Sequence, residues 1–239
     1  MLKRIWWKKS WVMDFGLSDM IKLCQNGVNP IIAEIKVYSP KHGDLLGKRN
    51  PLEILEAYEK CGVAGISYIT AKEFKGDFNL FKRICRESSL PVLRKDFILN
   101  KYEIEKTAEV EASAILLIAR FLKDKTPEFV DYALEHGLET LVEVHSIEDI
   151  AIAKQTKTTM IGVNNRDITK LEKDDGSVRI TEKLCEYLPK NVLKVSESGI
   201  RTIDDLKRAL RVADAVLIGT AFMVADDVEK IVKEFVEAI

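Results

Sequence analysis

The chain has 239 residues, 46% of them hydrophobic, which suits one α/β barrel or two smaller domains. Its 37 Lys and Arg residues nearly balance 38 Asp and Glu residues, so the chain lacks the basic excess that general nucleic-acid binding requires. No apolar run approaches the roughly 18 residues of a membrane span. Four scattered cysteines without a CxxC pair favour a reducing cytoplasm over a disulfide or metal framework.

The first 29 residues precede any repeating pattern. They start with a basic stretch that carries Trp6, Trp7 and Trp11 but lacks the apolar core and cleavage site of a signal peptide. We expect the tryptophans to dock on the body of the protein, with a cap at one end of it or a subunit contact as alternatives. A leading helix is expected around residues 16–25, over the mouth or the base of the main domain. We therefore predict an N-terminal extension, residues 1–29, and one domain, residues 30–239.

Eight short apolar segments follow, each predicted to begin a buried strand, and helix-period apolar positions lie between them. The segments recur about every 26 residues, a typical length for a βα unit. His136 and Gly137 are expected to stop the fourth helix, and Thr202 is expected to cap the start of the seventh. The predicted strands begin near Ile31, Gly65, Pro91, Ala114, Glu139, Met160, Val192 and Ala215.

Eight such units predict a (β/α)8 TIM barrel with a short N-terminal helical extension. The main alternative is a doubly wound open sheet. No GxGxxG motif follows the first strand. In addition, polar residues end strands along the whole chain, whereas an open sheet would gather them near one switch point. Both observations favour the barrel.

Charged side chains stand at the ends of several of these apolar strands. Glu34 and Lys36 are two residues apart on the first strand, so both face the same side and are expected to point into the barrel near its C-terminal rim. Lys95 ends the third strand and Glu143 lies in the fifth. A buried charge costs several kcal/mol, as an order of magnitude, unless it is paired or does chemistry. A structural ion pair explains one such pair, but four charges from separate strands predict an active site.

Interleaved lysines and carboxylates suit acid–base catalysis. Low dielectric and neighbouring cations lower the pKa of a lysine, and restricted solvation raises the pKa of a carboxylate. We therefore expect a lysine of the cluster to act as an acid near neutral pH and a carboxylate to act as a base.

Two glycine-containing loops predict a phosphate site. Ser198 and Gly199 follow the seventh strand, and Gly219 and Thr220 follow the eighth. Glycine lets backbone N–H groups approach an anion, and these two loops recur as phosphate sites in barrels of this type. Either glycine alone is explained by a tight turn, but the pair favours phosphate. Ser39, after the first strand, is a candidate to add a hydroxyl.

Further polar and aromatic residues follow the strands. Asn164, at the end of the sixth strand, suits a hydroxyl or amine, and Arg166 suits a bidentate clamp on a carboxylate. Asn165 and Asp167 are better explained as turn residues. Phe74, after the second strand, either stacks on a flat ring or anchors its loop.

At these positions the chain resembles the indole-3-glycerol phosphate synthase family of tryptophan biosynthesis. The matching segments run in family order from about residue 30 to the end. Each is short, but together they are highly specific. They are Pro30-Ile-Ile-Ala-Glu-Ile-Lys36, Ser39-Pro40, Leu93-Arg-Lys-Asp-Phe97, Leu141-Val-Glu143, Ile161-Gly-Val-Asn-Asn-Arg-Asp167, Ser196-Glu-Ser-Gly-Ile200 and Leu217-Ile-Gly-Thr220.

The resemblance implies ring closure of 1-(2-carboxyphenylamino)-1-deoxyribulose 5-phosphate to indole-3-glycerol phosphate, with loss of carbon dioxide and water. It implies that Lys95 is the general acid on the ketone oxygen and that Lys36 pairs with the substrate carboxylate. Glu143 would be the base that assists dehydration. Glu34 would orient the lysines and stabilise positive charge on the nitrogen.

The same resemblance assigns the binding residues and implies no metal or organic cofactor. Asn164, Arg166, Glu197 and Ser198 would line the pocket, and Ser39, Gly199, Gly219 and Thr220 would hold the phosphate. The chain departs from the family in three places: Val37 replaces a usual basic residue, the loop over 38–44 differs, and the segment before the first strand is short. These departures bear on affinity and loop closure more than on the reaction.

Two other functions fit less well. A phosphoribosyl anthranilate isomerase commonly uses a Cys/Asp pair, and no predicted strand ends in Cys. A barrel that only binds phosphate and serves as a partner subunit gains little from four buried charges. We expect a phosphorylated small molecule as partner, no nucleic acid, no membrane, and a monomer or weak homo-oligomer.

Overall fold

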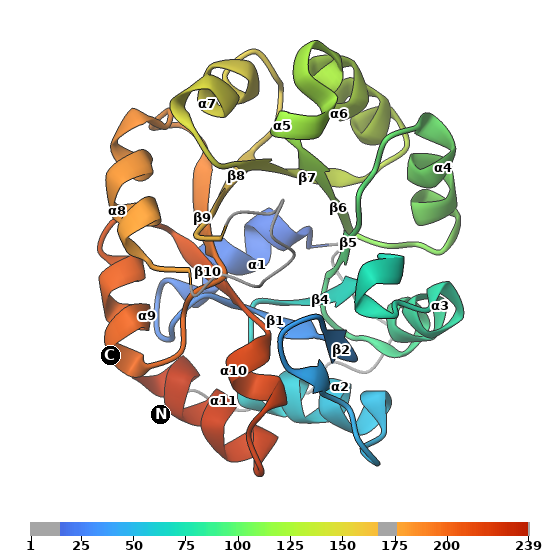
Figure 1. The fold of residues 1–239 in the computed structure, drawn as a ribbon, viewed down its shortest axis with the longest axis vertical. Coiled ribbons are helices and arrows are strands. Elements are labelled where there is room, and N and C mark those ends of the chain that lie inside the picture. Colours follow the sequence, from blue (N-terminus) through green and yellow to red (C-terminus); the bar gives the residue numbers. More distant parts are fainter. Residues whose placement is uncertain (1–14, 167–175, 239) are drawn as a thin grey trace.

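The computed structural model describes residues 15–166 and 176–238. Within them, eight parallel strands close into a barrel, and helices surround it (Figure 1). The predicted TIM barrel is therefore confirmed, and the open sheet is excluded by the pairing of the first strand with the last. Trp6, Trp7, Trp11 and Asp167 lie outside the described residues.

Each predicted strand begins within one residue of its expected position. Neighbours in the barrel follow the chain, and the first and last strands pair through Ile31 with Val216 and Ala33 with Ile218. The barrel strands are β1 (Ile31–Ile35), β4 (Gly65–Ile69), β5 (Val92–Lys95), β6 (Ala114–Ile118), β7 (Glu139–Val144), β8 (Met160–Asn164), β9 (Leu193–Glu197) and β10 (Ala215–Ile218).

Helices follow the strands on the outside of the ring. They are α2 (Pro51–Cys61), α3 (Phe78–Glu87), α4 (Lys101–Glu109), α6 (Thr126–Glu135), α7 (Ile147–Ala153), α8 (Arg179–Leu184), α9 (Ile203–Leu210) and α11 (Val228–Glu237). Smaller elements were not predicted. They are the hairpin β2 (Tyr38–Ser39) and β3 (Gly43–Asp44), the short helices α5 (Ala119–Leu122) and α10 (Thr220–Met223), and 3-10 turns at Lys72–Phe74, Lys123–Lys125 and Cys185–Tyr187.

Local sequence signals set the helix ends. The Thr202 hydroxyl accepts a hydrogen bond from the Asp205 N–H at 3.1 Å, and the Asp205 carboxylate accepts one from the Thr202 N–H in return. This reciprocal capping box confirms the predicted start of α9. Helix α6 ends at Glu135, and Gly137 takes a left-handed φ of 77° just beyond it. That conformation costs glycine little, which confirms the predicted stop.

Strand alternation creates two apolar layers. Ile31, Ala33 and Ile35 face the helices, while Ile32 joins a separate cluster inside the ring. The inner cluster also contains Leu93, Leu141, Met160, Val195, Ala215 and Leu217. The barrel interior is therefore a packed core and not an open pore.

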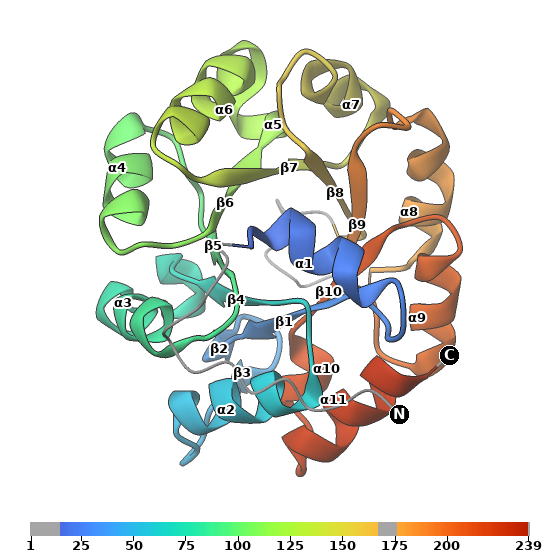
Figure 2. The same cartoon turned by 180° about the vertical axis from the view of Figure 1, so that it is seen from behind.

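Helix α1 (Leu17–Cys24) covers the base of the barrel, at the N-terminal ends of the strands (Figure 2). Leu17 and Ile21 are fully buried in the inner cluster. The Ser18 N–H donates to Glu139 Oε2 at 3.1 Å, at the start of β7. The predicted leading helix is confirmed, and of the two expected locations it takes the base.

None of the helices in the described part of the chain is both long and apolar enough to cross a membrane.

Candidate active site

A cavity of about 250 Å³ opens at the C-terminal ends of the strands. Three of its charged residues lie one inward-facing position beyond a residue of the apolar core: Glu34 follows Ile32, Lys95 follows Leu93, and Glu143 follows Leu141. Strand geometry therefore places a polar layer directly on an apolar one. Of the predicted site residues, those lining the cavity are Glu34, Lys36, Phe74, Lys95, Glu143, Asn164, Arg166, Ser198, Gly199, Gly219 and Thr220.

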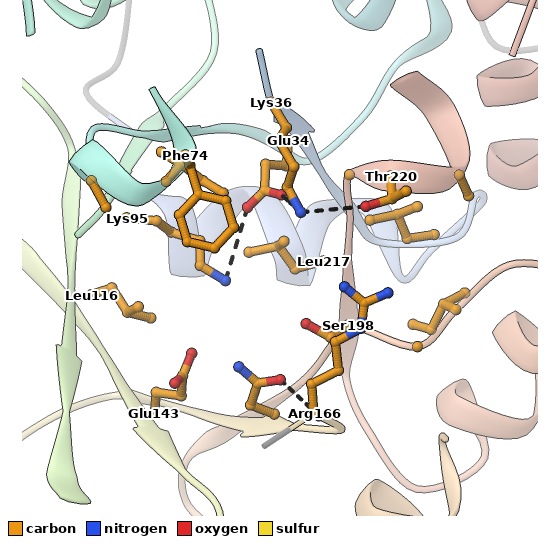
Figure 3. Close-up of a pocket in the computed structure, with 18 of the residues that line it drawn as sticks. Glu34, Lys36, Phe74, Lys95, Leu116, Glu143, Arg166, Ser198, Leu217 and Thr220 are labelled. Atoms are coloured by element: carbon orange, nitrogen blue, oxygen red, sulfur yellow. Dashed lines mark hydrogen bonds and ion pairs between the residues drawn. The ribbon is translucent and has the colours of Figure 1, made fainter. Parts of the chain in front are cut away.

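Glu34 connects the two lysines of the cavity (Figure 3). Its Oε1 lies 3.2 Å from Lys36 Nζ, and its Oε2 lies 3.9 Å from Lys95 Nζ. Glu34 and Lys36 are 3% and 4% exposed, so the pair is screened little by solvent. Two ammonium groups are therefore held within reach of one ligand.

Lys95 lies among carboxylates. Its Nζ is 2.8 Å from Glu197 Oε2. Burial alone lowers the pKa of Lys95, but the negative charges of Glu197, Glu34 and Glu143 outweigh burial and raise that pKa above its usual value. The expectation of a lowered lysine pKa is wrong, because three carboxylates surround this ammonium.

Glu197 is fully buried beneath Lys95 and is not among the residues that line the cavity. Burial, together with the charges of Glu143 and Glu34, raises its pKa to about 7 against the attraction of Lys95. The backbone at Gly162 makes room for it, because a Cβ there would overlap Glu197 Oε1. Glu197 was expected to line the pocket; in this structure it contacts the cavity through Lys95.

Glu143 is buried and hydrogen-bonded to His145, whose Nε2 lies 2.8 Å from Glu143 Oε1. Burial alone raises the pKa of Glu143, but the His145 hydrogen bond, the charges of Lys95 and His145, and the Asn164 amide together lower it below its usual value. The expectation of a raised carboxylate pKa is therefore wrong for Glu143 and right for Glu197.

The polar side chains at the end of β8 point to two different places. Asn164 and Arg166 line the cavity, and Asn164 Oδ1 accepts a hydrogen bond from the Arg166 N–H at 3.0 Å. The Asn165 amide instead donates to Ser196 Oγ at 3.0 Å and to the Ser198 carbonyl at 3.0 Å. Asn165 thus ties the end of β8 to β9 and to the loop that follows it, through long-range contacts that its assignment to a turn did not predict.

Two loops with unusual backbone form the side of the cavity predicted to hold phosphate. Ser198 and Gly199 both take left-handed φ values, 66° and 72°. Gly219 precedes the short helix α10, and a Cβ there would overlap Glu34 Oε1. Lys36 Nζ lies 3.3 Å from Thr220 Oγ1, so a cation stands beside these loops. Phe74 is buried, and Lys36 Nζ lies 5.7 Å from its ring centroid.

Ser39 is placed away from the cavity. It is fully buried in β2, where its Oγ accepts a hydrogen bond from the Lys41 N–H at 3.3 Å, and it is not a lining residue. The predicted phosphate role of Ser39 has no support from this placement, because the β2–β3 hairpin turns the hydroxyl into the protein.

Comparisons with known proteins agree on one family. The family model described as "Indole-3-glycerol phosphate synthase" matches residues 12–235. The indole-3-glycerol phosphate synthase of Pyrococcus abyssi is 64% identical over 225 residues, covering 94% of this chain and 97% of that protein. The chain belongs to the indole-3-glycerol phosphate synthase family. The Pyrococcus furiosus synthase is likewise 64% identical over 225 residues, covering 94% of this chain and 98% of its own length.

A solved structure with little sequence identity to this chain shares its fold. A solved chain from Aquifex aeolicus superposes with a TM-score of 0.68, is 14% identical, and covers 94% of this chain and 99% of its own. At such low identity the likeness concerns the barrel alone.

Two features of this indole-3-glycerol phosphate synthase family member escaped the sequence reasoning. His145 was not singled out as a site residue, although Glu143 and His145 show the same two-residue alternation as Glu34 and Lys36. An apolar wall, formed by Phe97, Leu116, Ile118 and Leu217, also lines the cavity. Leu116 and Leu217 belong to the inner core, so composition alone gave no sign that they face a ligand.

Proposed function

We propose that the cavity closes the indole ring of 1-(2-carboxyphenylamino)-1-deoxyribulose 5-phosphate and releases carbon dioxide and water. The observation that carries this proposal is the pair of buried ammonium groups, Lys36 and Lys95, held by the single carboxylate Glu34. One ligand with an anionic ring substituent and a neighbouring ketone needs two such cations at one place. Family membership supplies the identity of that ligand.

The rest of the cavity suits the remaining parts of the substrate. Its apolar wall offers a surface for the aromatic ring. The loops at Gly199 and Gly219 are the proposed phosphate site, since both glycines line the cavity and backbone N–H groups at glycine can approach an anion. Lys36 stands between Glu34 and Thr220. Its charge therefore favours the substrate carboxylate and, more distantly, the phosphate.

Lys95 is assigned as the general acid. During ring closure the aromatic carbon that bears the carboxylate attacks the ketone carbon, and the ketone oxygen becomes an alkoxide. The raised pKa keeps Lys95 protonated at neutral pH, and an alkoxide is a stronger base than an amine, so the proton moves from Nζ to oxygen. Glu34 lies beside both ammonium groups and can stabilise positive charge that develops on the substrate nitrogen.

Glu143 is assigned as the base of dehydration. After carbon dioxide leaves, Lys36 no longer pairs with the substrate carboxylate and is assigned to give a proton to the new hydroxyl, which departs as water. A proton must then leave the adjacent ring carbon. Glu143 is ionised at neutral pH because its pKa is lowered. Its Oε2 is buried and has no hydrogen-bond partner in the described residues. That oxygen is available to receive the proton.

The decisive experiment is a turnover assay that follows indole fluorescence with the anthranilate-derived ribulose phosphate. We expect the wild-type protein to form product and Lys95→Ala and Glu143→Ala each to lose about 10²-fold or more in kcat. Lys157→Ala is the matched control, because Lys157 is 74% exposed and pairs only at the surface with Asp131. No turnover by the wild type rejects the function, and full turnover by Lys95→Ala rejects the mechanism.

The isomerase alternative gains no support from the cavity. No cysteine is among the lining residues in the described chain, and Cys24, Cys61, Cys85 and Cys185 are all placed elsewhere as free thiols. Four free cysteines support the further proposal that the enzyme works in the cytoplasm, and the balanced charge supports the proposal that it binds no nucleic acid. A monomer or weak homo-oligomer remains our prediction for its assembly. Sedimentation velocity of the full chain tests the oligomeric state.

A further inference from the structure

His145 occupies a closed position behind the assigned base. It follows β7 directly, and its side chain is only 4% exposed. Its backbone N–H donates to Asp149 Oδ2 at 2.9 Å, in the first turn of α7. The backbone of His145 is therefore tied to the start of α7, and its imidazole is almost wholly shielded from solvent.

Both ring nitrogens of His145 face hydrogen-bond acceptors. Nδ1 lies 3.1 Å from the Arg166 carbonyl oxygen, and Nε2 lies 2.8 Å from Glu143 Oε1. A carbonyl oxygen only accepts, so Nδ1 carries a proton. With Glu143 ionised, Nε2 must then carry one as well. The two partners thus define a doubly protonated imidazolium facing a carboxylate.

The charges next to His145 agree with this state. Glu143 Oε1 lies 2.8 Å from His145 Nε2, and the other cation that acts on Glu143 is Lys95, whose Nζ is 2.8 Å from Glu197 Oε2. An imidazolium at His145 therefore gives Glu143 a cationic partner of its own.

Charged groups from neighbouring elements alter this balance little. Arg120 of α5 and Asp149 of α7 also act on His145, but Arg120 Nε lies 3.6 Å from Asp149 Oδ2, so these two charges largely offset each other. Although burial alone lowers the pKa of His145, the Glu143 carboxylate outweighs burial and raises it.

We infer that His145 is a positioning residue that holds Glu143 Oε1 as an imidazolium, keeps this carboxylate ionised, and directs its Oε2 toward the substrate. Oε2 makes no hydrogen bond to any described residue, so the bond from His145 to Oε1 leaves Oε2 as the oxygen that can take up a proton. The catalytic part of this inference rests on the proposed function, in which Glu143 is the base. The ionisation of His145 does not depend on it.

The first test is NMR of the ring nitrogens without substrate. We expect the His145 ring of the wild-type protein to stay doubly protonated well above the pH at which a free histidine deprotonates. In Glu143→Gln it loses this proton at lower pH, because the carboxylate is gone. His145→Gln identifies the signal, and His136→Gln is the control, since His136 is an exposed histidine on the outside of the barrel. Ordinary titration of His145 in both proteins overturns the inference.

The second test separates charge from geometry by kinetics. His145→Gln retains a donor for Glu143 but no charge, and His145→Phe removes both. We expect kcat at about pH 7 to fall about tenfold in the Gln variant and about 10²-fold in the Phe variant, with KM little changed. The acidic limb of kcat should move to higher pH in both, because an uncompensated Glu143 takes up its proton more readily.

An acidic limb that stays at its wild-type position in both variants reduces His145 to a packing role and overturns the inference. The two proposals fail separately. Absence of wild-type turnover rejects the reaction and leaves the NMR result to decide the ionisation of His145, whereas turnover with an ordinary His145 titration rejects the inference alone.

Discussion

Glu197 shows how the site depends on the smallest residue beside it. Gly162 on β8 leaves the space that Glu197 Oε1 occupies, and Oε1 has no hydrogen-bond partner in the described residues. Its other oxygen, Oε2, meets Lys95 at 2.8 Å. A buried carboxylate with one oxygen unpaired is costly to ionise, which agrees with its raised pKa.

This carboxylate should make stability depend on pH. Burial raises the pKa of Glu197 to about 7 from 4.5, so between those values the folded protein binds more protons than the unfolded chain. The contribution to stability is present below about pH 4.5 and is lost as pH rises through about 7. In urea unfolding from pH 5 to 8, we expect Glu197→Gln to gain on the order of 3 kcal/mol relative to wild type.

The control for that experiment is Glu56→Gln, since Glu56 is 64% exposed on α2. Its free energy of unfolding relative to wild type should stay nearly constant over the same pH range. A Glu197→Gln difference that is equally flat would show that Glu197 is already ionised at pH 5 in the folded protein.

At the scale of elements, α9 connects local sequence to the predicted phosphate loop. The capping box of Thr202 and Asp205 fixes the first turn of this helix directly after Gly199 and Arg201, both of which line the cavity. The box uses only neighbouring residues, so it forms whether or not a ligand is bound.

Thr202→Ala should cost about 1 kcal/mol in the free energy of unfolding, because the Asp205 N–H loses its acceptor. Thr202→Ser retains the hydroxyl, so it should lower the free energy of unfolding by only a few tenths of that amount. Chemical denaturation of the three proteins measures both changes. Equal stability of the Ala and Ser variants would mean that water replaces the cap without loss.

Elements with a strong local pattern were predictable, and the others were not. The eight barrel strands and the Thr202 cap follow from period and capping chemistry. The hairpin of β2 and β3 has two residues in each strand, too few for a period to appear. The burial of Ser39 in that hairpin was therefore not predictable either, and its phosphate role stays a prediction.

The candidate site was predictable in position but not in charge. Alternation along β1 placed Glu34 and Lys36 on one face, and the rim gathered Lys95 and Glu143 beside them. Their pKa values depend on which charges meet in space. Lys95 has three carboxylates as neighbours, and Glu143 has His145. The periodicity of the sequence does not show which charged side chains meet in the folded protein. His145 itself was within reach of the alternation rule.

At the scale of the molecule, α1 completes the core from below. Leu17 is fully buried, and its side chain lies against Gly65 at the start of β4. The inner cluster that it joins supports the charged layer from the opposite side. The inner cluster therefore contacts α1 at the base and lies directly beneath the charged residues at the C-terminal rim.

Leu17→Ala should destabilise the protein by about 2–5 kcal/mol, because it removes buried methyl groups and leaves a cavity beneath the ring. Leu23→Ala, on the same helix but 52% exposed, should cost far less. Thermal or urea unfolding of both variants measures the difference. If the two losses are alike, α1 contributes helix propensity but no packing to the barrel.

Because α1 closes the base of the barrel, substrate and products can pass only at the C-terminal ends of the strands. Apolar side chains fill the ring below Glu34, so ligand that enters past the strand ends has no exit on the far side. Carbon dioxide, water and the indole product therefore leave through the same cavity opening by which the substrate enters. A substitution that narrows this opening should therefore slow substrate uptake and product release alike.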